Sequence, residues 1–181
     1  MITHDVTIVG AGPVGLATAI FARNAGLSVQ VLDGGAIDGD KACGEGLMPG
    51  TAPLLAELGI DPPGHALEGV VYHQGSTRVE HSFPEKPGRG VRRTELRDAL
   101  VQRAHDGGVF IERAKYVSLT QDAHSATVTT DSGHYITSRY VIGCDGLHSS
   151  VAADLGVVKK PPRGAKRYGL RQHFAIAPWS S

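Results

Sequence analysis

The sequence is poor in cysteine, in aromatic residues and in net charge, and each shortage excludes a class of protein. Cys43 and Cys144 are its only cysteines, too few for a disulfide framework, so we expect a reducing compartment such as the cytoplasm. Its 18 basic residues balance 18 acidic ones, so we expect neither nucleic acid nor an anionic membrane as a partner. A local basic cluster at 159–167 has no interleaved aromatic residues, and we interpret it as an exposed linker.

Long apolar runs and clusters of metal ligands are missing as well. No apolar stretch approaches the roughly 20 residues of a membrane-spanning helix, and the first residues lack the pattern of a secretory signal. The nine histidines are scattered without the close pairs that zinc sites favour, so we predict no metal. With 181 residues the chain can bury one substantial core, and its oligomeric state stays open.

The first 33 residues combine a strand, a glycine-rich turn, a helix, a second strand and an acid. Residues 7–9 form an apolar, β-branched run that predicts a buried strand. Apolar residues then recur at helical spacing over 16–22, and Gly26 ends that helix. Residues 29–32 predict the second strand, which runs directly into Asp33. This order is the context in which a glycine-rich turn predicts a dinucleotide site.

Each residue type in this unit has a chemical reason. Gly10 allows the tight turn out of the strand, Gly12 lets a pyrophosphate approach the backbone, and Gly15 lets the helix pack closely on the sheet. The N–H groups at the start of the helix then stabilise the phosphate charge. Asp33 offers acceptors to ribose hydroxyls and would repel a 2′-phosphate, which disfavours NADP at this position.

The remaining sequence predicts an α/β fold interrupted by antiparallel strands. We expect a single unit over 1–181, with a dinucleotide-binding core at 1–60 and 90–156. Inserted strands at 68–84 and 167–177 would start a second, substrate-binding layer. Beyond the first unit, the pattern predicts helices at about 51–58 and 94–105, a short helix after Ser149, and strands at 69–73, 77–83, 109–111, 116–119, 126–130, 134–137, 140–143 and 168–177.

Two further turns have residues suited to phosphate. Arg93 stands at the start of the long helix, where its guanidinium could reach a phosphate or an adenine edge; the alternative is an ordinary solvated face. Asp145 and Gly146 end a buried strand, and Ser149 is placed to cap the helix that follows. This second turn has two interpretations, a phosphate-binding turn or a plain connection between strand and helix.

A third feature is the glycine-rich loop from Lys41 to Gly50. In a dinucleotide fold it would lie at the carboxyl edge of the sheet, where ligands bind. Cys43 is either a reactive thiol or, as free cysteines more often are, a small buried filler. Glu45 is either catalytic or a cap for backbone N–H groups, and the residues alone favour the cap.

Together these residues resemble the FAD-dependent oxidoreductases of the aromatic-hydroxylase type, which include group A flavoprotein monooxygenases, geranylgeranyl reductases and flavin-dependent halogenases. The glycines and Asp33 match the family's first fingerprint, and Arg93 matches its helix arginine. Asp145 and Gly146 match its Asp-Gly motif, although Ala152 stands where the family usually has an arginine. That departure weakens a nicotinamide contact at this motif more than it weakens FAD binding.

The resemblance implies a Rossmann-like FAD-binding domain with inserted strands, with FAD as cofactor and NAD(P)H as co-substrate. Our leading hypothesis is a monooxygenase that hydroxylates a small aromatic or polycyclic substrate with O2. The alternatives are a flavin-dependent reductase of unsaturated isoprenoids or lipids, and a non-catalytic FAD-binding fragment. The family's later Gly-Asp motif is absent, so we expect a chain truncated at its C-terminal end. No catalytic residue is assigned, and the residues predicted to hold the cofactor are Gly10, Gly12, Pro13, Val14, Gly15, Asp33, Gly34, Cys43, Gly44, Arg93, Asp145 and Gly146.

Overall fold

The computed structural model describes residues 3–35, 40–158 and 168–177. Its helices are α1 (Pro13–Asn24), α2 (Thr51–Glu57), α3 (Arg93–Asp106) and α4 (Ser150–Asp154). Its strands are β1 (His4–Val9), β2 (Val29–Leu32), β3 (Gly46–Leu47), β4 (His65–Leu67), β5 (Gly69–Gln74), β6 (Thr77–Ser82), β7 (Gly88–Gly90), β8 (Phe110–Glu112), β9 (Tyr116–Gln121), β10 (Ala126–Thr130) and β11 (Tyr135–Gly143).

The main sheet joins a parallel half to an antiparallel meander. Within the described residues its strand order is β8-β2-β1-β11-β10-β9, and β1, β2, β8 and β11 run parallel to one another. The long strand β11 belongs to both halves, because Ser138 is in register with His4 of β1 and also with Ala126 of β10. The carboxyl ends of the parallel strands therefore meet along one edge, where the glycine turn begins.

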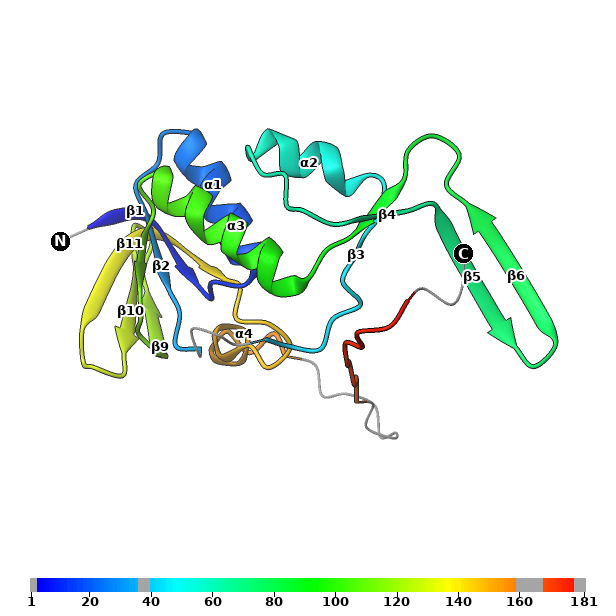
Figure 1. Ribbon diagram of the computed structural model, residues 1–181. Coiled ribbons are helices and arrows are strands. Elements are labelled where there is room, and N and C mark those ends of the chain that lie inside the picture. Colours follow the sequence, from blue (N-terminus) through cyan, green and yellow to red (C-terminus); the bar gives the residue numbers. More distant parts are fainter. Residues whose placement is uncertain (1–2, 36–39, 159–167, 178–181) are drawn as a thin grey trace.

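Both faces of this sheet are covered, which explains why its central strands are largely buried and rich in β-branched residues. Successive residues of a strand point to opposite faces. Ile8 belongs to a core with Leu16 of α1 and Leu100 of α3, while its neighbour Val9 belongs to a second core with Val151 of α4. Figure 1 shows α1 and α3 side by side against the sheet. The two helices and the sheet thus hold the turn between β1 and α1 rigidly.

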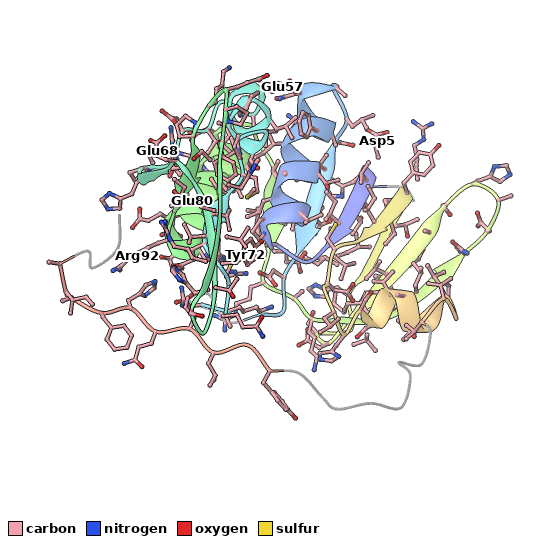
Figure 2. The ribbon with its side chains drawn as sticks, turned by 90° about the vertical axis from the view of Figure 1, so that its right-hand side faces the viewer. Asp5, Glu57, Glu68, Tyr72, Glu80 and Arg92 are labelled. Atoms are coloured by element: carbon pink, nitrogen blue, oxygen red, sulfur yellow. The ribbon has the colours of Figure 1, made fainter. Side chains whose placement is uncertain are left out.

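Two smaller sheets lie beyond this core. Strands β5 and β6 form a two-stranded antiparallel ribbon that projects away from the main sheet (Figure 1). Tyr72 and Glu80, labelled in Figure 2, lie on this ribbon, and all of β6 is exposed. The other sheet, β3-β7-β4, is one that the sequence pattern does not predict, because strands of two or three residues show no alternation. The ribbon confirms the predicted hairpin, and its assignment to a substrate-binding layer stays a prediction.

Most predicted elements are confirmed within a residue or two, but two predictions are wrong. Residues 168–177, predicted as a strand of the substrate layer, belong to no strand. The separate strands predicted at 134–137 and 140–143 are one continuous strand, β11, because the chain passes from the meander into the parallel half without a turn. The basic cluster at 159–167 lies outside the described residues.

None of the helices in the described part of the chain has the length and apolar character needed to cross a membrane.

Candidate functional site

A cavity of about 730 Å³ lies at the carboxyl edge of the parallel strands. Its walls come from the ends of β1 and β2, the start of α1, the first turns of α3, and the turns after β8 and β11. Residues predicted from four separate stretches of sequence meet there. Those that line the cavity are Gly10, Gly12, Pro13, Val14, Asp33, Gly34, Arg93, Asp145 and Gly146.

The three glycines of the first turn have different surroundings. A Cβ on Gly10 would stand 2.5 Å from the carbonyl oxygen of Cys144, and Gly10 has φ of 107°. A Cβ on Gly15 would stand 1.9 Å from the carbonyl oxygen of Gly10, and Gly15 is buried beneath the cavity and does not line it. A Cβ on Gly12 would meet no atom within 4 Å. The protein itself therefore requires glycine at the outer two positions, whereas the open space at Gly12 is available to a ligand.

The N-terminus of α1 faces this open space without a cap of its own. Gly12 is the N-cap residue and so provides no side-chain hydrogen bond, and the first turn of α1 contains no acidic residue. The leading N–H groups of a helix lack partners within the helix and carry partial positive charge. This end of α1 is therefore suited to an anionic group such as a diphosphate.

Asp33 directly follows β2 at the same edge and is half-buried. Its backbone N–H donates to the carbonyl oxygen of Glu112 at 3.0 Å, and its Oδ1 accepts from the N–H of Gly35 at 3.1 Å. The carboxylate still lines the cavity and has acceptor positions left for hydroxyl groups. Gly34 has a packing reason as well, since a Cβ there would stand 2.8 Å from the Cα of Lys115.

Asp145 is used chiefly to build the turn after β11. Its carboxylate accepts from the hydroxyl of Ser149 and from the N–H groups of Ser150 and Val151, at 2.5, 2.6 and 3.2 Å. Ser149 in turn accepts from the N–H of Ala152, which confirms the predicted cap. These bonds support the interpretation of Asp145 as part of a connection between strand and helix. Its direct contact with a cofactor stays a prediction.

Glu45 caps α3, as its residue type favours. Arg93 is the first residue of α3 and lines the cavity, and its backbone N–H donates to Oε1 of Glu45 at 2.9 Å. Arg171 and His173 also bond the Glu45 carboxylate. The N–H of Arg93, then His173 and Arg171, lower the pKa of Glu45 to about 2, so this carboxyl group is ionised near neutral pH.

The two cysteines differ from one another. Cys43 is exposed, which contradicts its interpretation as a buried filler, and its Sγ accepts from the N–H of Glu45 at 3.4 Å. Neither Cys43 nor Gly44 lines the cavity, so their approach to a flavin stays a prediction. Burial raises the pKa of the Cys144 thiol, which keeps it protonated and unreactive.

Sequence reasoning missed several cavity residues, among them three with basic side chains, Lys41, Arg97 and Lys115. Lys115 and Tyr116 follow β8, which lies beside β2, so the rule that parallel strands end at one edge would have found them. Cationic side chains suit a diphosphate. Tyr116 and His148 are further polar side chains in the lining that the sequence did not single out. Elsewhere in the described residues, no group of three or more His, Cys, Asp or Glu side chains is arranged to hold a metal ion.

A strand, glycine turn, helix and acidic residue around an open cavity define a dinucleotide-binding domain of the Rossmann-like type. A family model described as "FAD binding domain" matches residues 3–176, and the chain belongs to this family. This membership confirms the fold class and the resemblance found in the sequence.

Individual relatives include both reductases and monooxygenases. Menaquinone reductase of Mycobacterium tuberculosis is 34% identical over 165 residues, which cover 84% of this chain and 40% of that protein. Rifampicin monooxygenase of Streptomyces venezuelae is 30% identical over 164 residues, covering 84% of this chain and 34% of that protein. The anhydrotetracycline hydroxylase OxyS from Streptomyces rimosus has a similar structure, with a TM-score of 0.71 and 29% identity over 84% of this chain and 34% of its own. The chain thus spans about two fifths or less of the length of these relatives.

The residues around the cavity fit FAD. The open space at Gly12 admits a diphosphate, α1 presents uncapped N–H groups to it, and Asp33 offers ribose a carboxylate. Basic side chains on the cavity wall, Lys41 and Lys115 among them, match the negative charge.

Proposed function

We propose that this chain is the FAD-binding part of a flavin-dependent oxidoreductase, most closely a monooxygenase that hydroxylates a small aromatic or polycyclic substrate with NAD(P)H and O2. The observation that carries the FAD site is the vacant space over Gly12, at the uncapped N-terminus of α1, beside the carboxylate of Asp33. A glycine that nothing in the protein requires, at a place where a ligand would approach, is explained by that ligand.

The residues divide the work of binding between them. The N-terminus of α1 and the backbone at Gly12 would hold the diphosphate, and Asp33 would accept hydrogen bonds from the ribose. Arg93 and the backbone at Gly146 would flank the cofactor from α3 and from the turn after β11. When bound, FAD supplies the electron-transfer chemistry, which no side chain of this protein can provide. The protein's contribution is to bind the cofactor and to shield it from water.

Two relatives support the monooxygenase over other flavin enzymes. The names of rifampicin monooxygenase and of the anhydrotetracycline hydroxylase OxyS describe oxygenation of rifampicin and of anhydrotetracycline. A reductase of unsaturated isoprenoids or lipids is the second candidate, and the observation that favours it is the 34% identity to menaquinone reductase. Consumption of O2 coupled to product hydroxylation separates the two, because a reductase consumes none.

The first test is the visible absorption spectrum of the purified 181-residue chain with and without added FAD. We expect flavin bands that remain with the protein after gel filtration. A chain that stays colourless with excess FAD would contradict the proposed cofactor site. Flavin bands without oxidation of NAD(P)H in the presence of candidate substrates would instead support the third possibility, a non-catalytic FAD-binding fragment.

A further inference from the structure

Residues 168–177 (red in Figure 1) contribute to no sheet, yet two of their side chains bond the loop beside the cavity. Arg171 forms ion pairs with both Asp40 and Glu45, and its side chain is only 20% exposed. His173 bonds Oε2 of Glu45 through Nε2 at 2.7 Å. We call residues 168–177 the strap. It is attached through charged groups, chiefly at Glu45.

Glu45 is the point at which the strap meets the rest of the protein. Its side chain is 15% exposed, and each of its polar groups has a partner. Its backbone N–H donates to the Sγ of Cys43, and its carbonyl oxygen accepts from the N–H of Val91 at 2.8 Å. Its carboxylate receives the N–H of Arg93 and the two basic side chains of the strap. One residue therefore joins the loop, the start of α3 and the strap.

The backbone of Glu45 is held in an unfavourable conformation. Its φ is 56°, and it is the one residue other than glycine with positive φ among those described. Gly44 and Gly46 flank it, so the chain has glycine available on either side and nevertheless places a glutamate here. A left-handed conformation in a non-glycine residue persists only where surrounding contacts stabilise it, and it is a reason to look for a role.

Helix α3 depends on this contact because it has no local cap. Arg92 is its N-cap residue and makes no side-chain capping hydrogen bond. The acceptor comes instead from Glu45, which is 48 residues away in sequence. Arg93 and Arg97 of α3 and Lys41 of the loop all line the cavity. Glu45 therefore sets the relative position of two of its walls.

We infer that Glu45 is a positioning residue of the FAD site and that the strap, through Arg171 and His173, determines how tightly the site retains its ligand. This inference rests on the proposed binding of FAD. Attachment of the strap and binding of FAD should then favour each other. FAD should order the strap, and loss of the strap's contacts should weaken FAD binding by the same factor.

Two substitutions separate the strap from the cap. Glu45→Gln keeps an amide oxygen to accept from the N–H of Arg93 but loses the charge that pairs with Arg171. Arg171→Gln leaves Glu45 and α3 unaltered and removes the strap's ion pairs. Arg139→Gln is the matched control, since the Arg139–Asp5 pair lies at 3.4 Å on an exposed surface away from the cavity. If the Glu45→Gln variant does not fold, the Arg171→Gln variant alone still tests the inference.

The dissociation constant of FAD is measured by quenching of flavin fluorescence for the whole chain and each variant. We expect the dissociation constant to rise about tenfold for Glu45→Gln and for Arg171→Gln. The double variant should lose less than the sum of the two losses, because both substitutions break the Arg171–Glu45 ion pair. Arg139→Gln should match the wild type. In hydrogen exchange, FAD should slow the backbone amides of 168–177 in the wild type and not in Arg171→Gln.

The outcomes distinguish this inference from the proposed function beneath it. A wild-type chain that binds no FAD contradicts the proposed function, and the inference fails with it. Wild-type binding with unchanged dissociation constants in both variants overturns the inference alone. Additive losses in the double variant, or exchange at 168–177 that FAD does not alter, also overturn it, because either result means that the strap and the cavity act independently.

Discussion

The carbonyl oxygen of Gly10 occupies the space that a side chain on Gly15 would need, only 1.9 Å from the position of its Cβ. The turn that leaves β1 and the helix that follows it are thus packed backbone to backbone. Gly12 lies between these two residues in the sequence and has no such neighbour. Within one glycine-rich turn, two glycines serve the fold and the third faces the ligand.

This contrast predicts opposite behaviour for two alanine substitutions. Gly15→Ala should lower the free energy of unfolding by about 2 kcal/mol or more, because backbone atoms must move to admit the methyl group. Gly12→Ala should change it by less than about 0.5 kcal/mol, since Gly12 has φ of −73° and open space around it. The same Gly12→Ala substitution should weaken FAD binding at least about tenfold, because the methyl group fills the space of the diphosphate.

Urea unfolding measures the free energy of unfolding of both variants. Titration of flavin fluorescence measures the FAD affinity of Gly12→Ala. Full FAD affinity in a stable Gly12→Ala variant would mean that the diphosphate does not approach the chain at this turn.

Removal of the carboxylate at Asp33 should weaken FAD binding without unfolding the protein. Asp33 is half-buried at the cavity wall, and its carboxylate accepts a hydrogen bond from the neighbouring N–H of Gly35. Hydrogen bonds to a charged group contribute roughly 1.5–3 kcal/mol, so Asp33→Ala should raise the dissociation constant by about ten- to a hundredfold. Asp33→Asn keeps the shape and one acceptor and should lose less. Equal affinities for wild type and Asp33→Ala in a flavin titration would exclude the ribose role.

The local parts of this fold could be predicted from sequence because their causes are local. The unit from β1 to Asp33 is specified by residues a few positions apart, and so is the hairpin of β5 and β6. Both lie where the pattern places them. The strand predicted at 168–177 is wrong for the same reason. A local pattern does not show that side-chain ion pairs to a distant loop, and not a neighbouring strand, hold this segment.

What the sequence could not show are contacts between residues far apart in the chain. The cap that Glu45 provides to α3 joins positions 48 residues apart, and the bond from Arg171 to Glu45 joins positions 126 apart. No spacing rule reaches that far. Lys115 lies at the cavity because β8 pairs in parallel with β2, which places the residues after both strands at one edge; that pairing, once assumed, is enough to predict its position.

Tyr116 links the cavity wall to α4, and we expect its hydroxyl to contribute to stability. It is 8% exposed and donates to Oδ2 of Asp154 at 2.6 Å. Burial and the Asp154 carboxylate raise the pKa of Tyr116, so the hydroxyl remains a donor at any ordinary pH. Tyr116→Phe should lower the free energy of unfolding by about 1–2 kcal/mol, which urea denaturation measures.

Tyr135→Phe is the matched control, because Tyr135 is 75% exposed, and it should leave the urea midpoint unchanged. If Tyr116→Phe were as stable as this control, the bond to Asp154 would not hold α4 in place.

The carboxylate of Glu45 should make the stability of the chain depend on acid in a defined window. Its pKa falls from an ordinary 4.5 to about 2 in the folded protein, first through the N–H of Arg93 and then through the basic residues of the strap. A carboxyl group with a lower pKa in the folded state stabilises it fully above the unfolded value and ceases to do so as the pH falls toward the folded value. Stability contributed by Glu45 should thus be complete above pH 4.5 and disappear between 4.5 and 2.

Urea midpoints of wild type and Glu45→Gln, measured at steps through that window, test this expectation. The variant should be less stable near neutral pH, and the two curves should converge as the pH approaches 2. Glu57→Gln, at the end of α2 and labelled in Figure 2, controls for the loss of one carboxylate from the net charge. Curves for wild type and Glu45→Gln that stay parallel throughout would show that the folded protein does not hold this carboxylate ionised, and the contacts from α3 and from the strap would then contribute nothing through its charge.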